Sequence, residues 1–286
     1  MFVSISPVAV DLFTGLRTAT LSGDNGVSDA WTINHNGNGK IKISGPISAT
    51  LFNVQQLNVR TNGGADTVTY NLNADNVAAF TLDVDFGDNF NTVIGTDDRF
   101  NANLKGNINK SLTIRAQTRG NTDRIVVKAN RDTHTGGVRV ASGKTLNLDL
   151  QAGDEADTID VSYQGDMDGK LKIAAAGDGG GGLFNGGDII NATVIMDNGS
   201  GRLSTGQSGI GTLDMKLEGN GGTDTFSALV GDHSGGNVHI DQALVTSGAG
   251  LGSTVFLPTD KVKHTANVDV QGFQPDDDFD TIVAAP

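Results

Sequence analysis

The sequence predicts an all-β fold, a single-domain parallel β-helix (a β-solenoid), and three observations support this. Among the 286 residues, 31 are aspartates and only two are glutamates, Glu155 and Glu218. The chain also contains 40 glycines, the residue of tight turns. Finally, two strand patterns alternate along the chain with a period of 25 to 37 residues. We expect about eight or nine right-handed coils, each with three short strands.

The preference for aspartate over glutamate indicates turns rather than helices. Both residues carry the same charge, so a demand for charge cannot explain the preference. Glutamate is a good helix former, whereas aspartate bonds to nearby backbone groups and favours turns. The chain is therefore expected to consist of short strands joined by many tight turns.

The repeat is carried by two strand patterns and a weaker third one. In the first, an aspartate or asparagine precedes an alternating apolar strand, at Asp29, Asp66, Asn91, Asp123, Asp157, Asp188, Asp224 and Asp280. The second is a short strand with two inward apolar residues, such as Leu57/Val59, Leu82/Val84, Leu112/Ile114, Leu146/Leu148, Leu171/Ile173, Leu213/Met215, Val238/Ile240 and Val268/Val270. The third occurs in some gaps, at Ile41/Ile43, Ala102/Leu104 and Val138/Val140. Alternation with period two excludes a helical array. Tandem sandwich domains remain the alternative, but their strands do not repeat one pattern at this interval.

Composition limits the partners and the location. The net charge of −13 and pI near 4.6 argue against nucleic acid and anionic membranes as partners. The absence of cysteine excludes disulfides and thiolate metal sites. No stretch is long and apolar enough to span a membrane, and the first residues lack the features of a signal peptide. We expect an extracellular or cell-surface protein whose signal has been removed or whose export uses another route.

Outward positions of the second strand pattern predict a charge ladder. Counting three residues past the first apolar residue of successive strands gives Arg60, Asp85, Arg115 and Asp149. If the coils stack in register, Arg115 lies between Asp85 and Asp149, and opposite charges on adjacent strands attract. Each exposed pair would contribute at most about 1 kcal/mol.

Two turns resemble the calcium-binding repeat of secreted bacterial RTX proteins. These are the segments 219–226 (GNGGTDTF) and 63–68 (GGADTV), which are similar to the RTX pattern Gly-Gly-x-Gly-x-Asp. RTX repeats come in tandem about every nine residues, whereas here the spacing is far longer, and Glu155 stands where that pattern has glycine. More broadly, the chain is similar to the parallel β-helices of bacterial surface proteins, including adhesins and passenger domains. That resemblance implies architecture and location rather than an activity.

Calcium is the cofactor that the aspartates suggest. Carboxylates and turn carbonyls are the ligands that Ca²⁺ prefers. The candidate ligands are Asp66, Asp83, Asp85, Asp88, Asp224, Asp276 and Asp278. Stacked carboxylates about 4.8 Å apart would repel one another by about 1 kcal/mol per pair even in water, and cations would relieve this. In the alternative interpretation each aspartate bonds the backbone of its own turn and needs no ion.

Catalysis is not expected. If the protein were an enzyme, polysaccharide cleavage would be the activity to consider. Paired carboxylates would be required, and Asp85, Asp149 and Asp160 near Arg115 or Arg124 are the candidates. Sugar sites usually present aromatic platforms, but Trp31, Tyr70 and Tyr163 occupy strand positions predicted to point inward. The five histidines are scattered without metal-ligand spacing, and we expect them to be solvated.

The ends of the chain suggest self-assembly. We divide the chain into 1–20, a cap or inter-subunit pairing segment, and 21–286, the β-solenoid. Exposed strand edges at both ends could pair with another copy, which gives a head-to-tail homopolymer. The predicted contacts of that interface are Phe2, Val3, Ile5, Ile282 and Val283.

The expected function is a non-catalytic extracellular structural protein that forms filaments or acts as a surface adhesin, with a surface glycan as a further partner. A polysaccharide-active or sugar-binding β-helix and a calcium-stabilised secreted passenger domain are the alternatives.

Overall fold

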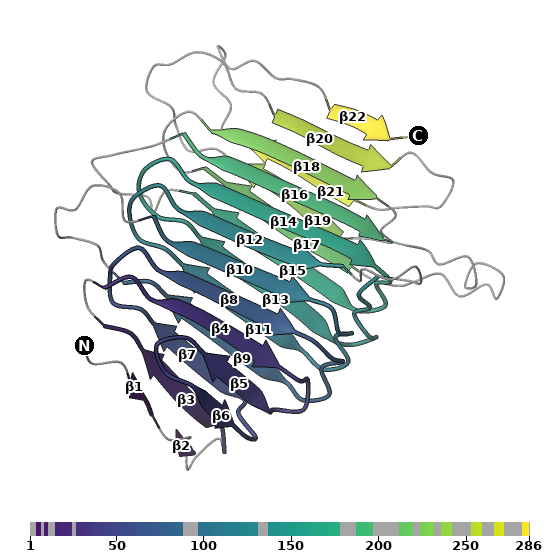
Figure 1. Cartoon of the computed structure of the whole chain (residues 1–286). Helices are drawn as coiled ribbons and strands as arrows, with labels where there is room; N and C mark the ends of the chain where they lie inside the picture. Colours follow the sequence, from purple (N-terminus) through teal and green to yellow (C-terminus); the bar gives the residue numbers. More distant parts are fainter. Residues whose placement is uncertain are drawn as a thin grey trace.

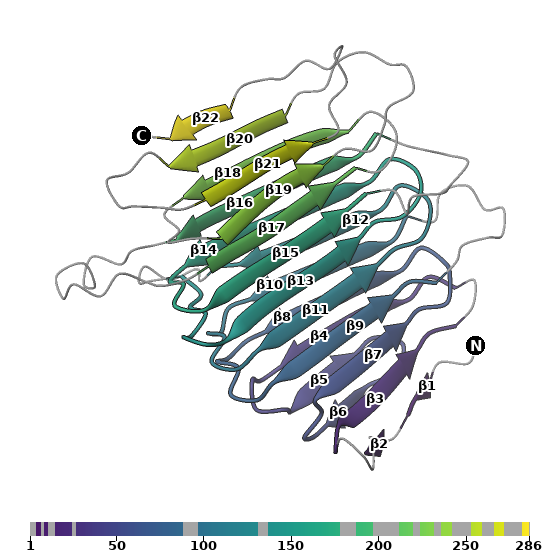
Figure 2. The ribbon, with the colours of Figure 1, turned by 180° about the vertical axis from the view of Figure 1, so that it is seen from behind.

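The structure consists of two mostly parallel β-sheets that lie face to face (Figures 1 and 2). It is a computed structural model that describes residues 4–6, 9–10, 15–24, 27–87, 97–130, 137–177, 187–196, 212–219, 224–231, 236–241, 253–258, 266–271 and 282–285. All regular elements in these ranges are strands, which confirms the all-β prediction. Among the described residues there is no helix that could cross a membrane.

Each sheet has 11 strands, and the chain alternates between the sheets. Sheet A contains β1 (Ser4–Ile5), β2 (Ala9–Val10), β3 (Arg17–Ser22), β7 (Gln56–Arg60), β9 (Phe80–Asp85), β11 (Leu112–Gln117), β13 (Thr145–Gln151), β15 (Lys170–Ala176), β17 (Thr212–Glu218), β19 (Gly236–Asp241) and β21 (Ala266–Gln271). Sheet B contains β4 (Ala30–His35), β5 (Ile41–Ser44), β6 (Ala49–Leu51), β8 (Thr67–Leu72), β10 (Arg99–Leu104), β12 (Arg124–Ala129), β14 (Thr158–Gly165), β16 (Ile189–Met196), β18 (Thr225–Gly231), β20 (Ser253–Pro258) and β22 (Ile282–Ala285). We call one sheet A strand and the following sheet B strand a circuit. Successive circuits add parallel strands to both sheets, as in the pairs β7–β9 and β8–β10.

The two strand patterns in the sequence correspond to the two sheets. Strands that follow an aspartate lie in sheet B, and strands with two inward apolar residues lie in sheet A. One copy was assigned wrongly, because the third sheet B strand of this kind is β10, which follows Asp98. Asn91, the predicted start of that strand, lies outside the described residues.

The prediction of three strands per coil is wrong, because the circuits whose connections the structure describes in full, such as the one from β7 through β8 to β9, have two. The predicted pair Ala102/Leu104 belongs to the sheet B strand β10, and Ile41/Ile43 belongs to β5, which is antiparallel to β4. At the third position single residues pair in isolated bridges, Asn76 with Ile108, Ile108 with Val140, and Val140 with Met167. In the connection from β12 to β13, Gly137 also pairs antiparallel with Gly165. The connections from sheet B back to sheet A are therefore paired through isolated bridges rather than through a third strand.

A continuous apolar core fills the space between the sheets. Inward residues alternate with outward ones along each strand, as in β8, where Val68, Tyr70 and Leu72 are fully buried. Trp31 and Tyr163 are only 1 % exposed, so the inward prediction for the three large aromatic residues with polar groups is confirmed. The hydroxyl oxygen of Tyr163 lies within hydrogen-bond distance of the backbone carbonyls of Val138 (2.7 Å) and Asp166 (2.9 Å), and its single proton can be donated to either.

Antiparallel strands of the same chain cover the N-terminal end of both sheets. In sheet A, β1 and β2 pair antiparallel with β3, and the side chain of Ile5 packs against the core. In sheet B, β5 pairs antiparallel with β4, and β6 pairs antiparallel with β5. The N-terminal segment thus folds over its own first circuit, and β3 already begins at Arg17, inside the segment 1–20 that the sequence assigned to the cap.

Of the predicted interface residues, the structure describes three. Ile5 lies on the cap strand β1, at the N-terminal end. Ile282 and Val283 begin β22, where they pair with Val255 and Phe256 of β20 at the far end of sheet B (Figure 1). Phe2 and Val3 lie outside the described residues.

Glu155 has a left-handed backbone conformation in the turn between β13 and β14. Its φ is +83°, and the side chain is exposed. The equivalent position, two residues before the aspartate that precedes the sheet B strand, is occupied by Gly64 (φ +121°) and Asn121 (φ +79°) in other circuits. Glycine and asparagine tolerate this region, whereas it is strained for a glutamate.

We predict that Glu155→Asn stabilises the protein by about 0.5–1 kcal/mol, because asparagine relieves the backbone strain without changing a buried contact. Urea unfolding monitored by Trp31 fluorescence measures the change. Asn121→Glu, at the equivalent position, is the reciprocal variant and should destabilise by a similar amount. A destabilised Glu155→Asn variant would contradict the assigned backbone conformation.

Candidate functional site

A file of seven buried aspartates runs along the corner where sheet A leads into sheet B. Each residue stands immediately before a sheet B strand, and each is at most 2 % exposed. The members are Asp29, Asp66, Asp98, Asp123, Asp157, Asp188 and Asp224. We refer to them as the aspartate file. It is the longest polar array in the described core.

Hydrogen bonds join the members of the aspartate file from one circuit to the next. The backbone N–H of each aspartate donates to Oδ1 of the aspartate in the following circuit. The distances are 2.6 Å (Asp29 to Asp66), 2.8 Å (Asp66 to Asp98), 2.7 Å (Asp98 to Asp123), 2.7 Å (Asp123 to Asp157), 2.9 Å (Asp157 to Asp188) and 2.9 Å (Asp188 to Asp224). The carbonyl of Asp29 also accepts from the N–H of Thr67 at 2.8 Å, so the backbone is tied to the next circuit at both its donor and its acceptor.

The alternative in which each aspartate bonds the backbone of its own turn is met at the N-terminal end. There, the N–H of Asp24 donates to Oδ2 of Asp29 at 3.0 Å within one turn. From Asp66 onward, Oδ1 of each member accepts from the N–H of the aspartate in the preceding circuit. The aspartates therefore link the circuits, a role that the sequence did not predict.

A second column of residues faces the aspartate file across the corner. These are the residues that directly follow sheet A strands: Gly23, Thr61, Phe86, Thr118, Ala152, Gly177 and Gly219. We call them the corner column. A Cβ atom on Gly177 would lie 1.8 Å from Oδ2 of Asp188, and one on Gly219 would lie 1.9 Å from Oδ2 of Asp224. Glycine is required there because the carboxyl group occupies the place of a side chain.

Two threonines of the corner column contact both the next circuit and the file. The Thr61 hydroxyl donates to the Phe86 carbonyl at 3.0 Å, and the Thr118 hydroxyl donates to the Ala152 carbonyl. Thr61 also lies beside the Asp66 carboxyl, and Thr118 lies beside that of Asp123. These two contacts lower the pKa of the carboxyls and so oppose the effect of burial.

Burial raises the proton affinity of three carboxyl groups in the aspartate file. Desolvation raises the pKa of Asp66 to about 6, that of Asp123 to about 7 and that of Asp224 to about 6, against the opposing effect of the backbone hydrogen bonds that they accept. Their Oδ2 atoms are buried without a hydrogen-bond partner. Neighbouring negative charge adds to the rise, from Asp29 at Asp66 and from Asp97 and Glu155 at Asp123. These groups can hold protons near neutral pH, but burial separates them from any substrate.

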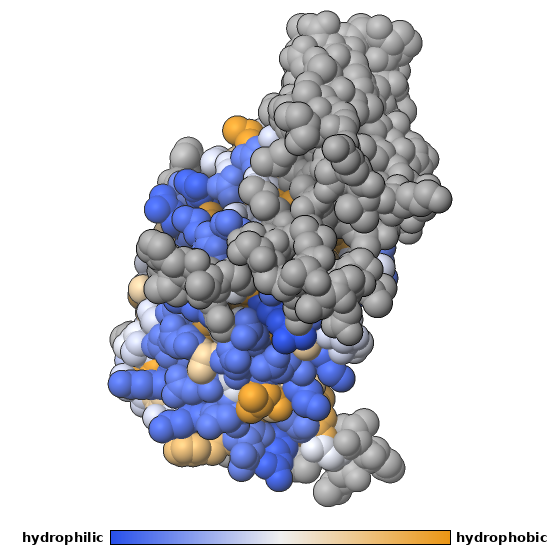
Figure 3. Space-filling view, turned by 90° about the vertical axis from the view of Figure 1, so that its right-hand side faces the viewer, coloured by the Kyte–Doolittle hydropathy of each residue, from blue (hydrophilic) through white to orange (hydrophobic). Residues whose placement is uncertain are grey.

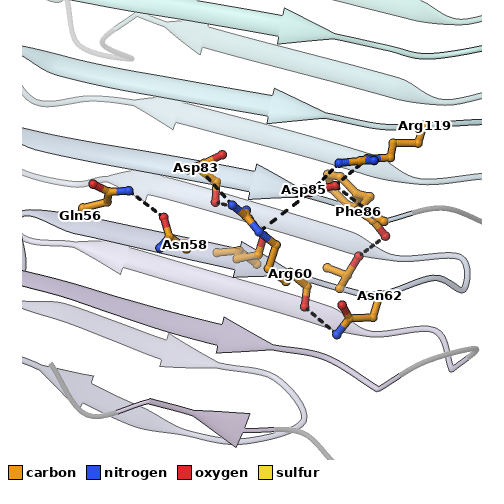
Figure 4. A network of polar contacts seen from close by, with 11 residues as sticks. Gln56, Asn58, Arg60, Asn62, Asp83, Asp85, Phe86 and Arg119 are labelled. Atoms are coloured by element: carbon orange, nitrogen blue, oxygen red, sulfur yellow. Dashed lines mark hydrogen bonds and ion pairs between the residues drawn. The ribbon is translucent and has the colours of Figure 1, made fainter. Parts of the chain in front are cut away.

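The outer face of sheet A carries a network of ion pairs (Figure 4). Arg60 contacts Asp83 at 3.1 Å and Asp85 at 3.9 Å. Arg119, which follows β11, forms two hydrogen bonds to Asp85, of 3.0 and 2.9 Å. Asp85 therefore lies between two arginines, and Arg115 contacts Asp149 at 3.8 Å further along the sheet.

The predicted charge ladder is correct for two of its three contacts. Arg60 is the register partner of Asp85, and Arg115 is the partner of Asp149. The other register partner of Arg115 is Asp83, not Asp85. The cause is Phe80, which opens β9 and pairs with Leu112, so the inward residues of this strand begin one pair earlier than Leu82 suggested.

The proposed calcium ligands are not brought together. Asp66 and Asp224 are buried in the aspartate file, whereas Asp83 and Asp85 lie on the face of sheet A and pair with arginines. Within the described ranges no three His, Asp or Glu side chains form a cluster suited to a metal ion. Asp88, Asp276 and Asp278 lie outside the described residues. The described candidates therefore do not fit a shared calcium site.

The catalytic candidates are also separated. Asp85 and Asp149 lie on sheet A, two strands apart, and Asp160 lies on sheet B, where it pairs with Arg124 at 2.8 Å. Asp160 also accepts a hydrogen bond of 2.9 Å from Asn191. Since these carboxylates face outward from different sheets or pair with arginines, they form no general acid and base pair across a bound sugar.

His35 differs from the prediction that the histidines are solvated. It is fully buried, and its Nδ1 lies 2.8 Å from the Tyr70 hydroxyl, while its ring centroid is 4.5 Å from that of Phe80. Burial lowers the pKa of His35 to about 4, so the ring is neutral at physiological pH. His134, His233 and His264 lie outside the described residues, and the side chain of His239 is not described.

Sequence reasoning missed Asp98 and the corner column. Asp98 could have been found, since it directly precedes an alternating strand, but the earlier Asn91-Thr-Val-Ile imitates the same pattern. The corner column had no such signal, because glycine, threonine, alanine and phenylalanine share no property that repeats. Its members are equivalent only through their position after each sheet A strand.

Comparison with known proteins adds no relative: no family model, no curated protein and no solved structure matches the chain.

We predict that Asp123→Ala lowers the free energy of unfolding by about 1–3 kcal/mol, because it leaves the buried N–H of Asp98 without an acceptor. Asp123→Asn keeps an acceptor oxygen and should cost less. Asp97→Ala removes an exposed carboxylate beside the file and serves as the control, with an effect within about 0.5 kcal/mol. Urea unfolding of the three variants measures the difference. Equal effects at 97 and 123 would show that the file does not link the circuits.

We also predict that the protein is more stable in mild acid than in mild base. Raised folded-state pKa values mean that the folded chain binds more protons than the unfolded chain between pH 4 and 7, so stability falls as pH rises through this window. His35 has the opposite effect on stability below pH 6.5. Its folded-state pKa is lowered, so the unfolded chain binds the proton more readily and the folded chain loses stability as the pH falls. Urea unfolding between pH 6 and 8 should show the decline, and Asp123→Asn should reduce its slope. A flat profile in the parent protein would contradict the raised carboxyl pKa values.

Proposed function

We propose that the chain is a non-catalytic β-solenoid that serves as a structural element outside the cell, a rigid rod that displays its two sheet faces. The observation that carries the proposal is the aspartate file, which connects each circuit to the next from Asp29 to Asp224. Nine circuits at about 4.8 Å each correspond to a rod on the order of 40 Å long.

Stiffness along the rod axis supports this role. Two sheet ladders and the aspartate file resist separation of neighbouring circuits. At the opposite corner, Asp75 accepts from the N–H of Asn107 (2.9 Å), and Asn107 accepts from the N–H of Arg139 (3.1 Å). Side-chain acceptors thus reinforce the backbone ladders at both corners. This arrangement suits a spacer or scaffold that carries load or holds a surface at a fixed distance.

The side faces also favour a non-catalytic role. Several of their charged groups are engaged in pairs, such as Arg60 with Asp83 and Arg139 with Asp168, and the carboxyls with raised pKa are buried. An enzyme that cleaves polysaccharides needs two accessible carboxylates across one cleft. Two partly exposed carboxylates, those of Asp149 and Asp214, line one hollow on sheet A, but each lies against a cation, Arg115 and Lys170 respectively.

A location outside the cell is part of the proposal. It is supported by the resemblance of the aspartate and glycine turns to secreted repeats. Calcium stabilisation remains a separate proposal that depends on Asp88, Asp276 and Asp278, since the described candidates do not converge.

Between a single surface rod and a head-to-tail filament, we favour the single rod with a spacer or adhesive role. Filament growth by continued parallel sheets needs an open edge at β3 and β4. Those edges already pair with β1, β2 and β5 of the same chain. The filament requires these cap strands to move, whereas the single rod needs no rearrangement.

We predict that the protein is a monodisperse, elongated monomer in analytical ultracentrifugation at every concentration. Ile5→Lys should promote self-association, because a lysine at this partly buried position loses its packing on the core, which weakens the pairing of β1 with β3 and exposes the edge of β3. Ser4→Lys, on the exposed side of the same strand, is the control and should stay monomeric. Filaments of the unmodified protein with an axial repeat of about 40 Å, seen by negative-stain electron microscopy, would favour the assembly version instead.

A further inference from the structure

The N-terminal end of the molecule carries local positive charge, although the whole chain has a net charge of −13. Residues 30–65 contain no aspartate and no glutamate. Two lysines of this segment, Lys40 and Lys42, lie on either side of Ile41 at the start of β5, and both are exposed. Neither lysine forms an ion pair within the described part of the chain. On sheet A, by contrast, Lys170 and Lys216 lie against carboxylates of Asp214 and Glu218.

Phe52 adds an apolar group to the same surface. It directly follows β6 and is 60 % exposed, more than any other large hydrophobic residue whose side chain is described. Nζ of Lys40 lies 5.6 Å from the centroid of its ring, and Lys42 is the register partner of Thr50, two residues before Phe52. We call Lys40, Lys42, Thr50 and Phe52 the basic edge patch. Hydrophobic groups are also visible toward this end of the molecule, in the lower part of the side on which the sheet B strands end (Figure 3).

The strand β6 has an open edge beside the basic edge patch. It is the last strand of sheet B at this end, and β5 is the only described strand that pairs with it. No described residue forms a hydrogen bond to the backbone of Ala49–Leu51 from the other side. Alternate residues of a strand direct their N–H and C=O groups to that side, where they can pair with a further extended segment. Because β6 spans only three residues, these backbone bonds are few, and neighbouring side chains must supply part of the affinity.

Each of these features selects a different property of the ligand. An open strand edge pairs with the backbone of an extended polypeptide, which neither a saccharide nor a nucleic acid possesses. The two lysines favour acidic side chains, and Phe52 favours an apolar one. An anionic lipid surface would make no use of the backbone groups of β6, and the net charge of −13 would oppose its approach.

We propose that an extended acidic segment of a partner protein adds to sheet B along the open edge of β6. One of its apolar side chains packs on Phe52, and its carboxylates reach Lys40 and Lys42 across β6. The added strand lies about 9–10 Å from β5, twice the usual strand spacing, which a lysine and a glutamate side chain together can bridge. The inference goes beyond the structural role, because it gives one end of the molecule a means of attachment. It does not rest on that role, so either can fail alone.

Fluorescence anisotropy of the dye-labelled peptide Thr-Glu-Thr-Phe-Thr-Glu-Thr, titrated with the full chain, tests the proposal. The peptide places Glu, Phe and Glu on one face of a strand and reads the same in both directions, so it suits parallel and antiparallel addition alike. We expect saturable binding that weakens with added salt. Two control peptides should bind more weakly. One has Gln in place of Glu and lacks the charges, and the other has Pro in place of the two central Thr residues and lacks two backbone N–H donors.

Variants of the basic edge patch should weaken binding of the acidic peptide. Lys42→Gln should do so by about threefold, the effect of losing one exposed ion pair, and Phe52→Ala by about fivefold, through loss of an aromatic contact. Both side chains are exposed, so we expect the variants to fold, and a thermal melt checks this. Lys172→Gln is the matched control, since Lys172 is an exposed lysine on sheet A, and it should leave binding unchanged.

The proposal is overturned if the acidic peptide does not bind, or if either control peptide binds as tightly as it does. Equal weakening by Lys172→Gln and Lys42→Gln would also overturn it. Co-sedimentation with phosphatidylserine vesicles that Lys42→Gln abolishes would assign the patch to a lipid surface. Self-association of the unmodified chain that Lys42→Gln abolishes would show that the occupant is a second copy. Either of these two results contradicts a separate protein partner.

Discussion

The hydrogen bond from the N–H of one aspartate to the carboxyl of the next is the contact on which the stacking of circuits depends. At this corner the chain leaves sheet A and enters sheet B, and a buried backbone donor must find an acceptor. The aspartate of the following circuit supplies it, as Asp66 does for Asp29 at 2.6 Å. The same contact sets the register of β4 against β8, since Ala30 and Thr67 directly follow these residues and are paired.

Side-chain length explains why the file contains aspartate and not glutamate. The carboxyl of Asp188 already fills the space that a Cβ atom on Gly177 would need, and that of Asp224 does the same at Gly219. A further methylene group would enter the backbone of the facing turn. The penalty for burying these carboxyls is reduced where a proton binds, because a neutral carboxyl is easier to bury than a charged one. The compositional bias of the chain thus has a partly steric origin.

The sequence was sufficient for features set by local chemistry and insufficient for features set by stacking. Alternation and turn residues are local, so the two strand patterns and the inward position of Tyr70 were predictable, whereas the division of the strands into two sheets was not. The neighbour of Arg115 was not, because register depends on Phe80, whose place at the start of β9 is decided by its partner strands. Nor could the sequence show that Thr61 faces Asp66, or that Asp149 and Asp214 line one hollow, since these residues meet only when circuits stack.

Because of the aspartate file, the geometry of the corner does not depend on the length of the loop that connects sheet A to sheet B there. Four residues (62–65) lie between Thr61 and Asp66, whereas eleven (87–97) lie between Phe86 and Asp98, yet both aspartates occupy equivalent places in the file. Since the contact is made by the two ends of the loop, the number of residues between them can differ from one circuit to another. Evolution can lengthen or replace these loops without altering the core, and foreign peptides grafted there would be displayed at one edge of the molecule without disturbing the stack.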